Sequence, residues 1–393
     1  MSKPLVLTCD IGTQSARALL VDPDGRIVDV VQSKYAEPYF SKEPGWAEQK
    51  PNFYFDRLCE CCRELCVRSN ALLPDVIAMT ITVIRDTVVC LDANNEPLRD
   101  IILWLDKRTV DPNGAMPAKN MMLFKVAGME PTAKVVYAAS VGNWIMRHEP
   151  EIWARTAKYV MLPTYLNYKL TGNLIDSASN QIGHIPFDYK NRRWMKPGSL
   201  TRCFCDVPNE KLCDLVPSGT VIGTVTDEVC ALTGIPAGLP LISTGSDKGC
   251  ETLGLAVVDS DKASISLGTT ATIQFSTTEY VEPQQFLPAY PGVLNDHYNP
   301  EIEIYRGLWL LSWFVKEFGT ADAIDAKEKG MAPEALLDQR IRDLPAGSDG
   351  LLLQPYWTAG ILHPDSLGAV IGFSDYHTRY HFYRPIIEGL CLE

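Results

Sequence analysis

The chain has 393 residues, of which 46% are hydrophobic and 21% charged, and its formal net charge is -12. This composition supports a sizeable core and argues against disorder, and the length favours two lobes over one ordinary domain. The acidic balance argues against a nucleic-acid surface; no apolar stretch reaches membrane-span length, and the N-terminus lacks a signal-peptide profile. We therefore predict a cytoplasmic protein with neither a nucleic-acid nor a membrane partner.

Residues 4–31 predict a β-meander. Three apolar runs have strand length, and Asp24-Gly25 between the last two is a strong hairpin signal. The first turn combines an acid, a glycine, two hydroxyls and a cation, namely Asp10, Gly12, Thr13, Ser15 and Arg17. Glycine lets backbone amides turn toward a ligand, and successive amides form an anion-binding nest. Alone, the stretch favours an ordinary polar hairpin turn over an anion site.

Residues 263–274 repeat this layout in the other half of the chain. An apolar strand leads into Leu267-Gly268-Thr269-Thr270, and a second apolar strand follows. Two facing Gly-Thr hairpins can hold a polyphosphate from opposite sides. The repeat therefore makes the anion-binding interpretation of the first turn worth pursuing.

Strand and helix patterns alternate between the two hairpins, which indicates α/β architecture. The expected elements are a helix over 52–68 with Asn52 as its cap, strands over 76–82 and 101–105, and mostly helix over 117–170. We predict one lobe over residues 1–245 and a second over 246–393. The second lobe contains an apolar helix over 305–318 that Gly319 stops. Its last helix has no terminating Gly or Pro, so the sequence looks cut within an element.

The chain has 12 cysteines, several of them clustered. The clusters are Cys59, Cys61, Cys62 and Cys66, and then Cys203, Cys205 and Cys213. Zinc ligation or disulfides are one interpretation, but no CxxC pair recurs at finger spacing and the first cluster falls within a helical pattern. We expect reduced, buried thiols instead.

Seven short motifs are spread over nearly the whole chain, at residues 10–17, 45–49 (GWAEQ), 104–108 (WLDKR), 218–223, 245–249 (GSDKG), 267–270 and 388–389. In their order and spacing the chain resembles the FGGY carbohydrate kinases. The resemblance implies an α/β, two-lobe, actin-like (ribonuclease H-like) sugar kinase fold. It also implies an incomplete second lobe, because the family's Gly-rich, adenosine-contacting segment would follow residue 393. We accordingly expect a chain truncated at its C-terminus.

Phosphoryl transfer needs positioning, a metal that neutralises the phosphates and a base for the attacking hydroxyl. The resemblance implies that Asp247 is this base; a helix N-cap is its structural alternative. It implies that Asp10 holds Mg²⁺, through water. The residues expected around the ATP phosphates are Asp10, Gly12, Thr13, Ser15, Arg17, Gly268, Thr269 and Thr270. For Arg17 an ion-pair role is equally compatible with the sequence.

The acceptor contacts expected from the resemblance are Arg85, Asp86, Trp104, Asp106, Tyr137 and Lys248. Arg85 beside Asp86 offers donors and acceptors for vicinal hydroxyls, although a structural ion pair fits as well. Trp104 could instead be an ordinary residue of the hydrophobic core, and Asp106 could instead be a structural cap. Lys248 departs from the glycerol kinase pattern, and a cation there either receives an oxidised or anionic polyol or lowers the pKa of Asp247.

The leading hypothesis is an ATP- and Mg²⁺-dependent kinase acting on a ketopentose, a tetritol or a related sugar or polyol. Its rival is a non-catalytic sugar-binding or regulatory relative of the same fold. A P-loop enzyme is disfavoured because GxxxxGK[ST] does not occur. The expected partner is a small molecule, and homodimerisation is left open.

Overall fold

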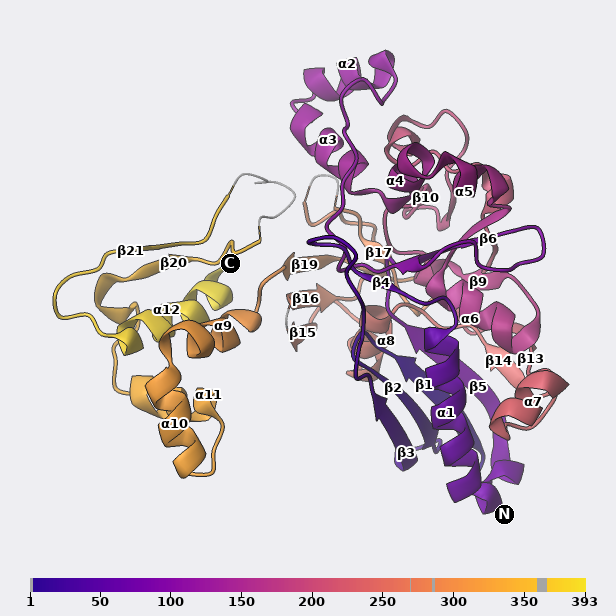
Figure 1. The fold of residues 1–393 in the computed structure, drawn as a ribbon, viewed down its shortest axis with the longest axis horizontal. Helices are drawn as coiled ribbons and strands as arrows, with labels where there is room; N and C mark the ends of the chain where they lie inside the picture. The colour runs from indigo at the N-terminus through magenta and orange to yellow at the C-terminus, as the bar shows by residue number, and fades with distance from the viewer. Residues whose placement is uncertain (1–2, 269, 285–286, 359–365) are drawn as a thin grey trace. The chain divides into compact units, whose positions relative to one another are not determined.

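The computed structural model describes residues 3–268, 270–284, 287–358 and 366–393 (Figure 1). The chain forms two compact units. The first comprises Met1–Asp259 and Ser276–Pro300, and the second Ser260–Phe275 and Glu301–Glu393. None of the helices in the described part of the chain combines the length and hydropathy that a bilayer crossing requires.

The first unit is built on a six-stranded sheet in the order β13-β14-β5-β1-β2-β3. The strands are β1 (Leu5–Ile11), β2 (Ser15–Val21), β3 (Ile27–Lys34), β5 (Val76–Val83), β13 (Val221–Thr224) and β14 (Pro240–Ile242). β1, β2 and β3 pair antiparallel in succession, which confirms the predicted meander. β5 runs parallel to both β1 and β14. The Asp24-Gly25 turn is also confirmed, with Gly25 at φ 77°.

Helix α1 (Phe53–Arg68) packs its apolar face on this sheet (Figure 1). Asn52 occupies the N-cap position, as predicted, but its side chain makes no capping bond, and its Oδ1 instead accepts from the Tyr165 hydroxyl at 2.8 Å. The clustered cysteines of α1 are buried, and Cys62 Sγ lies 3.5 Å from Cys9 Sγ on β1. Every cysteine is a free thiol and most are buried, as expected.

The first unit also contains a smaller sheet, further helices and short strand pairs. A second sheet contains β4 (Glu48–Gln49), β7 (Ile101–Ile102), β6 (Val88–Leu91) and β8 (Lys158–Met161). The helices are α2 (Ala118–Val126), α3 (Glu130–Ala139), α4 (Val141–His148), α5 (Pro150–Arg155), α6 (Leu162–Thr171), α7 (Asp227–Thr233) and α8 (Asp247–Gly254). The short strand pairs are β9 (Ile175–Ser177) with β12 (Asp214–Val216), β10 (Phe187–Asp188) with β11 (Arg193–Trp194), and β17 (Tyr290–Pro291) with β18 (Tyr298–Asn299).

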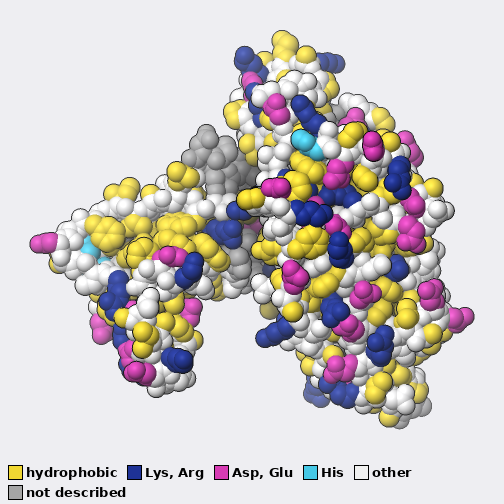
Figure 2. Space-filling model, viewed as in Figure 1, with side chains coloured by type: hydrophobic (Ala, Val, Ile, Leu, Met, Phe, Trp, Pro, Cys, Tyr) yellow, Lys and Arg dark blue, Asp and Glu magenta, His cyan; other side chains and the backbone are white. Residues whose placement is uncertain are grey.

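Charges of both signs are interspersed on the visible face of the first unit, at the right of Figure 2. On this face Lys and Arg side chains do not gather into a stripe of the kind that nucleic-acid binding uses.

The second unit has its own sheet and core. β15 (Ala263–Leu267), β16 (Ala271–Phe275) and β19 (Glu301–Ile304) pair antiparallel in that order, which confirms the second hairpin. The other elements are α9 (Trp309–Phe318), α10 (Thr320–Glu328), α11 (Pro333–Ile341), β20 (Leu352–Gln354), β21 (Ala369–Ile371) and α12 (Arg379–Leu392). Phe314, Leu337 and Tyr383 are central to the core. α9 begins later than predicted, because the chain pairs with β16 through residue 304 and Leu308 N then bonds Gly268 O.

The compact units divide the chain differently from the predicted lobes. Helix α8 belongs to the first unit, where Thr82 Oγ1 on β5 lies 3.6 Å from Cys250 Sγ on α8. The lobe boundary after residue 245 therefore stays a prediction, whereas the contacts of Asp247 described below are contacts within the first unit.

Candidate active site

The carboxyl ends of three parallel strands lie at one edge of the main sheet. Ligands of open α/β sheets bind at such an edge. Asp10 lies near the end of β1, Arg85 follows β5, and Asp247 begins α8 after β14. The sheet topology thus brings together one predicted residue from each of three segments that are far apart in the sequence.

Hydrogen bonds join the segments that leave this edge. Ile84 N donates to Ile11 O at 3.1 Å, which joins the end of β5 to the end of β1. Thr244 Oγ1 donates to Ile81 O at 2.5 Å, which joins the segment before α8 to β5. Hydrogen bonds to carbonyls of β1 and β5 therefore hold the segments that carry Arg85 and Asp247.

Asp247 is the first residue of α8, but it is not the cap of that helix. The N-cap is Ser246, whose side chain accepts from Gly249 N, whereas Asp247 Oδ1 accepts from Lys248 N at 2.9 Å. Arg85 Nε lies 4.0 Å from Asp247 Oδ1, and the Asp247 side chain is 28% exposed. Burial raises the pKa of Asp247, and the charge of Arg85 offsets part of this effect.

Lys248 acts on the pKa of Asp247 in the direction that one of its two sequence interpretations gave, but it does not determine the net shift. Its charge acts to lower the pKa of Asp247, but burial outweighs it and the net shift is upward. The Lys248 ammonium itself donates to Glu251 Oε2 at 2.8 Å on the same helix. Much of its charge is therefore compensated locally.

The first Gly-Thr turn is held by contacts of its own. Asp10 Oδ2 and Arg17 Nη1 form an ion pair of 2.6 Å across the β1–β2 ladder, so the ion-pair alternative for Arg17 holds in this structure. Gly12 N donates to Ser15 O at 3.0 Å and closes the turn. The Ser15 hydroxyl is buried and hydrogen-bonds to the Gln32 amide at 3.2 Å. The Gly12 amide and the Ser15 hydroxyl are thus engaged within the hairpin.

Thr13 lies beside a predicted acceptor contact. Trp104 Nε1 donates to Thr13 Oγ1 at 3.0 Å, and the Trp104 residue is 40% exposed. Trp104 is therefore not plain core. Its indole lies against the first turn with part of its surface open.

Asp86 is paired with a histidine that sequence reasoning missed. Asp86 Oδ1 accepts from the backbone N of His184 at 3.0 Å, and Oδ2 lies 2.9 Å from His184 Nδ1. Burial works against the charge of Asp86, but His184 outweighs it and the pKa of Asp86 is lowered. His184 falls in the stretch that was hardest to assign from sequence, and a lone His after a Gly carries no signal of its partner.

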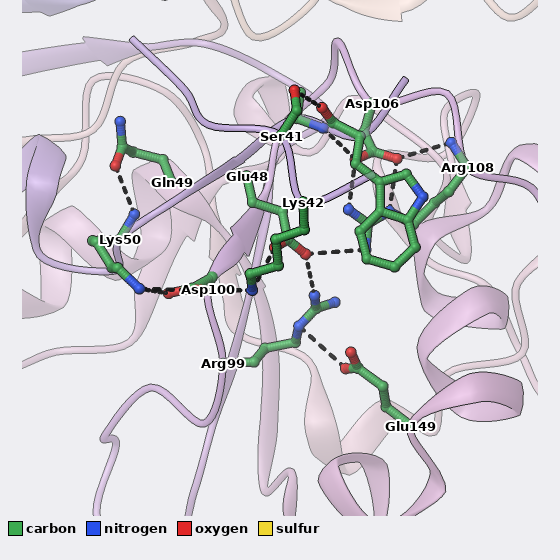
Figure 3. Close-up of polar contacts among 12 residues, drawn as sticks. Ser41, Lys42, Glu48, Gln49, Lys50, Arg99, Asp100, Asp106, Arg108 and Glu149 are labelled. Atoms are coloured by element: carbon green, nitrogen blue, oxygen red, sulfur yellow. Dashed lines mark hydrogen bonds and ion pairs between the residues drawn. The ribbon is translucent and has the colours of Figure 1, made fainter. Parts of the chain in front are cut away.

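Asp106 belongs to a buried charge network rather than to the carboxyl edge (Figure 3). Its carboxylate accepts from Ala47 N at 2.7 Å and from the Arg108 guanidinium in two bonds of 2.7 Å. Arg108 also pairs with Glu48, and their side chains are 2% and 1% exposed. The structural alternative for Asp106 therefore describes its contacts here.

The remaining predicted residues have contacts of their own. Tyr137 is half-buried on α3, and its carbonyl accepts from Asn143 Nδ2 at 3.0 Å. Gly268 and Thr270 belong to the turn of the second unit, where Thr270 Oγ1 donates to Tyr305 O at 3.4 Å. Thr269 lies outside the described residues.

The fold places the chain in a definite structural class. A solved xylulose kinase from Rhodospirillum rubrum superposes with a TM-score of 0.80 at 25% identity, covering 99% of this chain and 77% of that one. A solved gluconate kinase from Lactobacillus acidophilus has a TM-score of 0.81 at 22% identity, covering 99% and 76%, which shows the fold alone. The architecture is the actin-like, two-lobe α/β fold of sugar kinases, as predicted.

Residues 5–254 match the FGGY family of carbohydrate kinases, N-terminal domain, and the chain belongs to this family. The uncharacterized sugar kinase YgcE of Escherichia coli K12 is 26% identical over 393 residues, covering 100% of this chain and 72% of the relative. A xylulose kinase of Bacillus subtilis is 25% identical over 401 residues, covering 98% and 75%. The chain is a carbohydrate kinase that uses ATP to phosphorylate a hydroxyl of a sugar or polyol. These findings favour the kinase over the non-catalytic alternative.

Proposed function

We propose that Asp247 is the general base of this kinase and that Arg85 orients the acceptor beside it. The observation that carries the proposal is the Asp247 carboxylate at the carboxyl edge of the sheet, with Arg85 Nε 4.0 Å away. The acceptor oxygen forms a bond to the γ-phosphorus of ATP while the bond between that phosphorus and the ADP oxygen breaks. The hydroxyl proton passes to Asp247, which positions and activates the nucleophile.

The residues at the first turn fit the magnesium salt of ATP. A carboxylate oxygen is the ligand type that Mg²⁺ prefers, and the Asp10 side chain is 37% exposed. Because Asp10 is already paired with Arg17, binding through the metal's own water suits it best. The ion would neutralise charge on the phosphates. Thr13 and, from the second turn, Gly268, Thr269 and Thr270 are the proposed phosphate contacts.

The acceptor that we propose is a ketopentose or a closely related sugar or polyol. The support is the similarity to proteins named xylulose kinase, with the half-exposed Trp104 as a surface for a carbon skeleton. A second candidate is an aldonic acid, since a Bacillus licheniformis relative is named gluconokinase and the Arg85 cation lies at the edge. Tetritols and glycerol complete the set worth testing.

An acceptor screen tests the proposal directly. ATP consumption by the full-length protein is measured with Mg²⁺ against ketopentoses, tetritols, aldonic acids and glycerol. We expect turnover with a ketopentose or an aldonate, and product phosphorylation is confirmed by mass. Turnover confined to glycerol would contradict the proposed acceptor, and no turnover with any of them would contradict the proposal as a whole.

Replacing Arg85 with Gln is expected to move the acid limb of the pH profile to higher pH. Asp247 must be deprotonated to act as base, so kcat/KM falls as the pH drops through its pKa. Burial already raises this pKa, and the Arg85 charge opposes the rise. Removing that charge raises the pKa further. The measurement is kcat/KM for the acceptor against pH in both proteins, and an acid limb that does not move would contradict the pairing.

A further inference from the structure

A series of contacts links Arg85, which lies beside Asp247, to His184. The Arg85 guanidinium lies over the Tyr290 ring at 5.4 Å, and Tyr290 packs edge-on against Tyr189 at 5.6 Å. The Tyr189 hydroxyl donates to Gly183 O at 3.0 Å. The next residue, His184, pairs through Nδ1 with the carboxylate of Asp86, which follows Arg85 in the chain. These contacts link His184 to Arg85, whose Nε lies 4.0 Å from the Asp247 carboxylate.

The backbone on both sides of this histidine is specialised for the contact. Asp86 has a left-handed φ of 48°, a conformation that few residues other than Gly adopt. Gly183 has a φ of 150°, and a Cβ at that position would collide with the Asp86 carboxylate. Two unusual conformations thus meet where Asp86 and His184 pair. Of the two residues only Asp86 carries backbone strain, which persists where the surrounding structure enforces it and is concentrated at functional sites.

Both Asp86 oxygens are engaged by His184, and a direct contact of Asp86 with the acceptor stays a prediction. A carboxylate only accepts hydrogen bonds, so His184 Nδ1 must carry a proton and donate it. Among the residues that the structure describes, Nδ1 is the only ring atom of His184 with a hydrogen-bond partner. The side chain is 32% exposed. The free polar atom of the pair is Nε2.

The electrostatic surroundings of the ring act on the pKa of His184 in two opposite directions. Burial works against a charge on His184, but the Asp86 carboxylate outweighs burial and raises the pKa of His184. A protonated imidazole donates from both nitrogens and accepts from neither. Nε2–H is then a charged donor, and such donors bond most strongly to anionic or strongly polar oxygens.

We infer that His184 contacts the acceptor through Nε2 and selects for a carbonyl or carboxylate oxygen over a hydroxyl at that position. This inference rests on the proposed function, because it takes the acceptor site to lie beside Asp247 and Arg85. Asp86 is in this view a positioning residue that orients the imidazole. The predicted chemical class is a ketose or an aldonate in preference to the corresponding alditol.

The test compares each of two His184 substitutions with a matched control. His184→Asn keeps an amide nitrogen where Nδ1 bonds Asp86 but has no atom at the Nε2 position. His184→Gln places an amide nitrogen near the Nε2 position, so it restores part of the contact. His297→Asn is the control, since His297 Nδ1 also pairs with an aspartate, Asp296, at 2.7 Å. Calorimetry measures acceptor affinity without ATP, and kinetics give kcat and KM for a ketose, its alditol and the matching aldonate.

We expect His184→Asn to weaken binding of the preferred oxidised acceptor by about 10- to 100-fold, the effect of losing one charged hydrogen bond. Alditol binding should change little, so the preference collapses, and His184→Gln should recover part of it. His297→Asn should keep the wild-type preference. A His184→Asn protein with unchanged preference would overturn the inference while leaving the kinase assignment intact. A wild-type protein inactive on every acceptor would instead contradict the proposed function.

Discussion

Asp247→Asn is expected to lower kcat by about 100- to 10,000-fold, the usual contribution of a positioned general base. Asparagine preserves the shape of the side chain but cannot take the hydroxyl proton at neutral pH. It can still accept from Lys248 N, as Asp247 Oδ1 does at 2.9 Å, so α8 should begin normally. The Arg85 contact loses its charge partner, and a small change in acceptor affinity is expected alongside the loss of turnover. Steady-state kinetics with the best acceptor measure kcat, and calorimetry measures the affinity.

Asp227→Asn is the matched control for this substitution. Asp227 is also the first residue of a helix, α7, directly after a hydroxyl cap, Thr226, and it is exposed. A general effect of removing an acid from a helix start would appear equally in both variants. We expect Asp227→Asn to keep the wild-type kcat. If Asp247→Asn keeps more than a tenth of the wild-type kcat, the assignment of the base is wrong.

Arg108→Ala is expected to reduce the free energy of unfolding of the first unit by about 3–5 kcal/mol, the cost of breaking a buried ion pair. Arg108 joins two buried carboxylates, Asp106 at 2.7 Å and Glu48 at 3.0 Å (Figure 3). Its guanidinium also lies 3.7 Å from the Trp46 ring centroid and 4.6 Å from that of Trp144. Removing it leaves Asp106 without its main charge partner. Denaturant unfolding followed by tryptophan fluorescence measures the loss.

Arg193→Ala provides the comparison for this change. Arg193 pairs with Asp188 at 3.7 Å, but its side chain is 55% exposed. Exposed ion pairs contribute about 0–1 kcal/mol, so this variant should be nearly as stable as the wild type. Equal losses of unfolding free energy in the two variants would show that the buried network contributes no more to stability than an exposed ion pair. The network around Arg108 also holds the Gly-Trp-Ala-Glu-Gln segment in place, because Ala47 N donates a hydrogen bond to the Asp106 carboxylate at 2.7 Å.

Local patterns were sufficient to predict the two hairpins. The alternating apolar residues of β1 and the Asp24-Gly25 turn act over a few residues, so their outcome is decided by neighbours in the chain. The position of Asp247 at the start of a helix was predicted for the same reason. The cap of this helix could not be predicted in the same way. A Ser246 hydroxyl and an Asp247 carboxylate are both good caps, and the backbone geometry determines which of them caps the helix.

Residues with two possible roles were resolved by contacts with distant segments. The Asp106 carboxylate could have faced a polyol, but its burial beside Arg108 and Ala47 shows a structural role in these contacts. Trp104 could have been core, but it lies half-exposed against Thr13. Asn52 had the right position for a cap, and the Tyr165 hydroxyl on α6 engaged its oxygen instead. Such partners lie far away in the sequence and leave no local signal.

The sequence by itself determined the family, the α/β class and the identity of the candidate base. These conclusions depend on motif order, residue type and short-range periodicity, which are all properties of the linear sequence. Only the tertiary structure decided that Asp86 is engaged by His184, through the backbone N and the ring Nδ1 of the histidine. That pairing joins residues 98 positions apart in the sequence, and it depends on a left-handed Asp86 and on the absence of a Cβ at Gly183. Long-range contacts of this kind are set by sheet topology and packing.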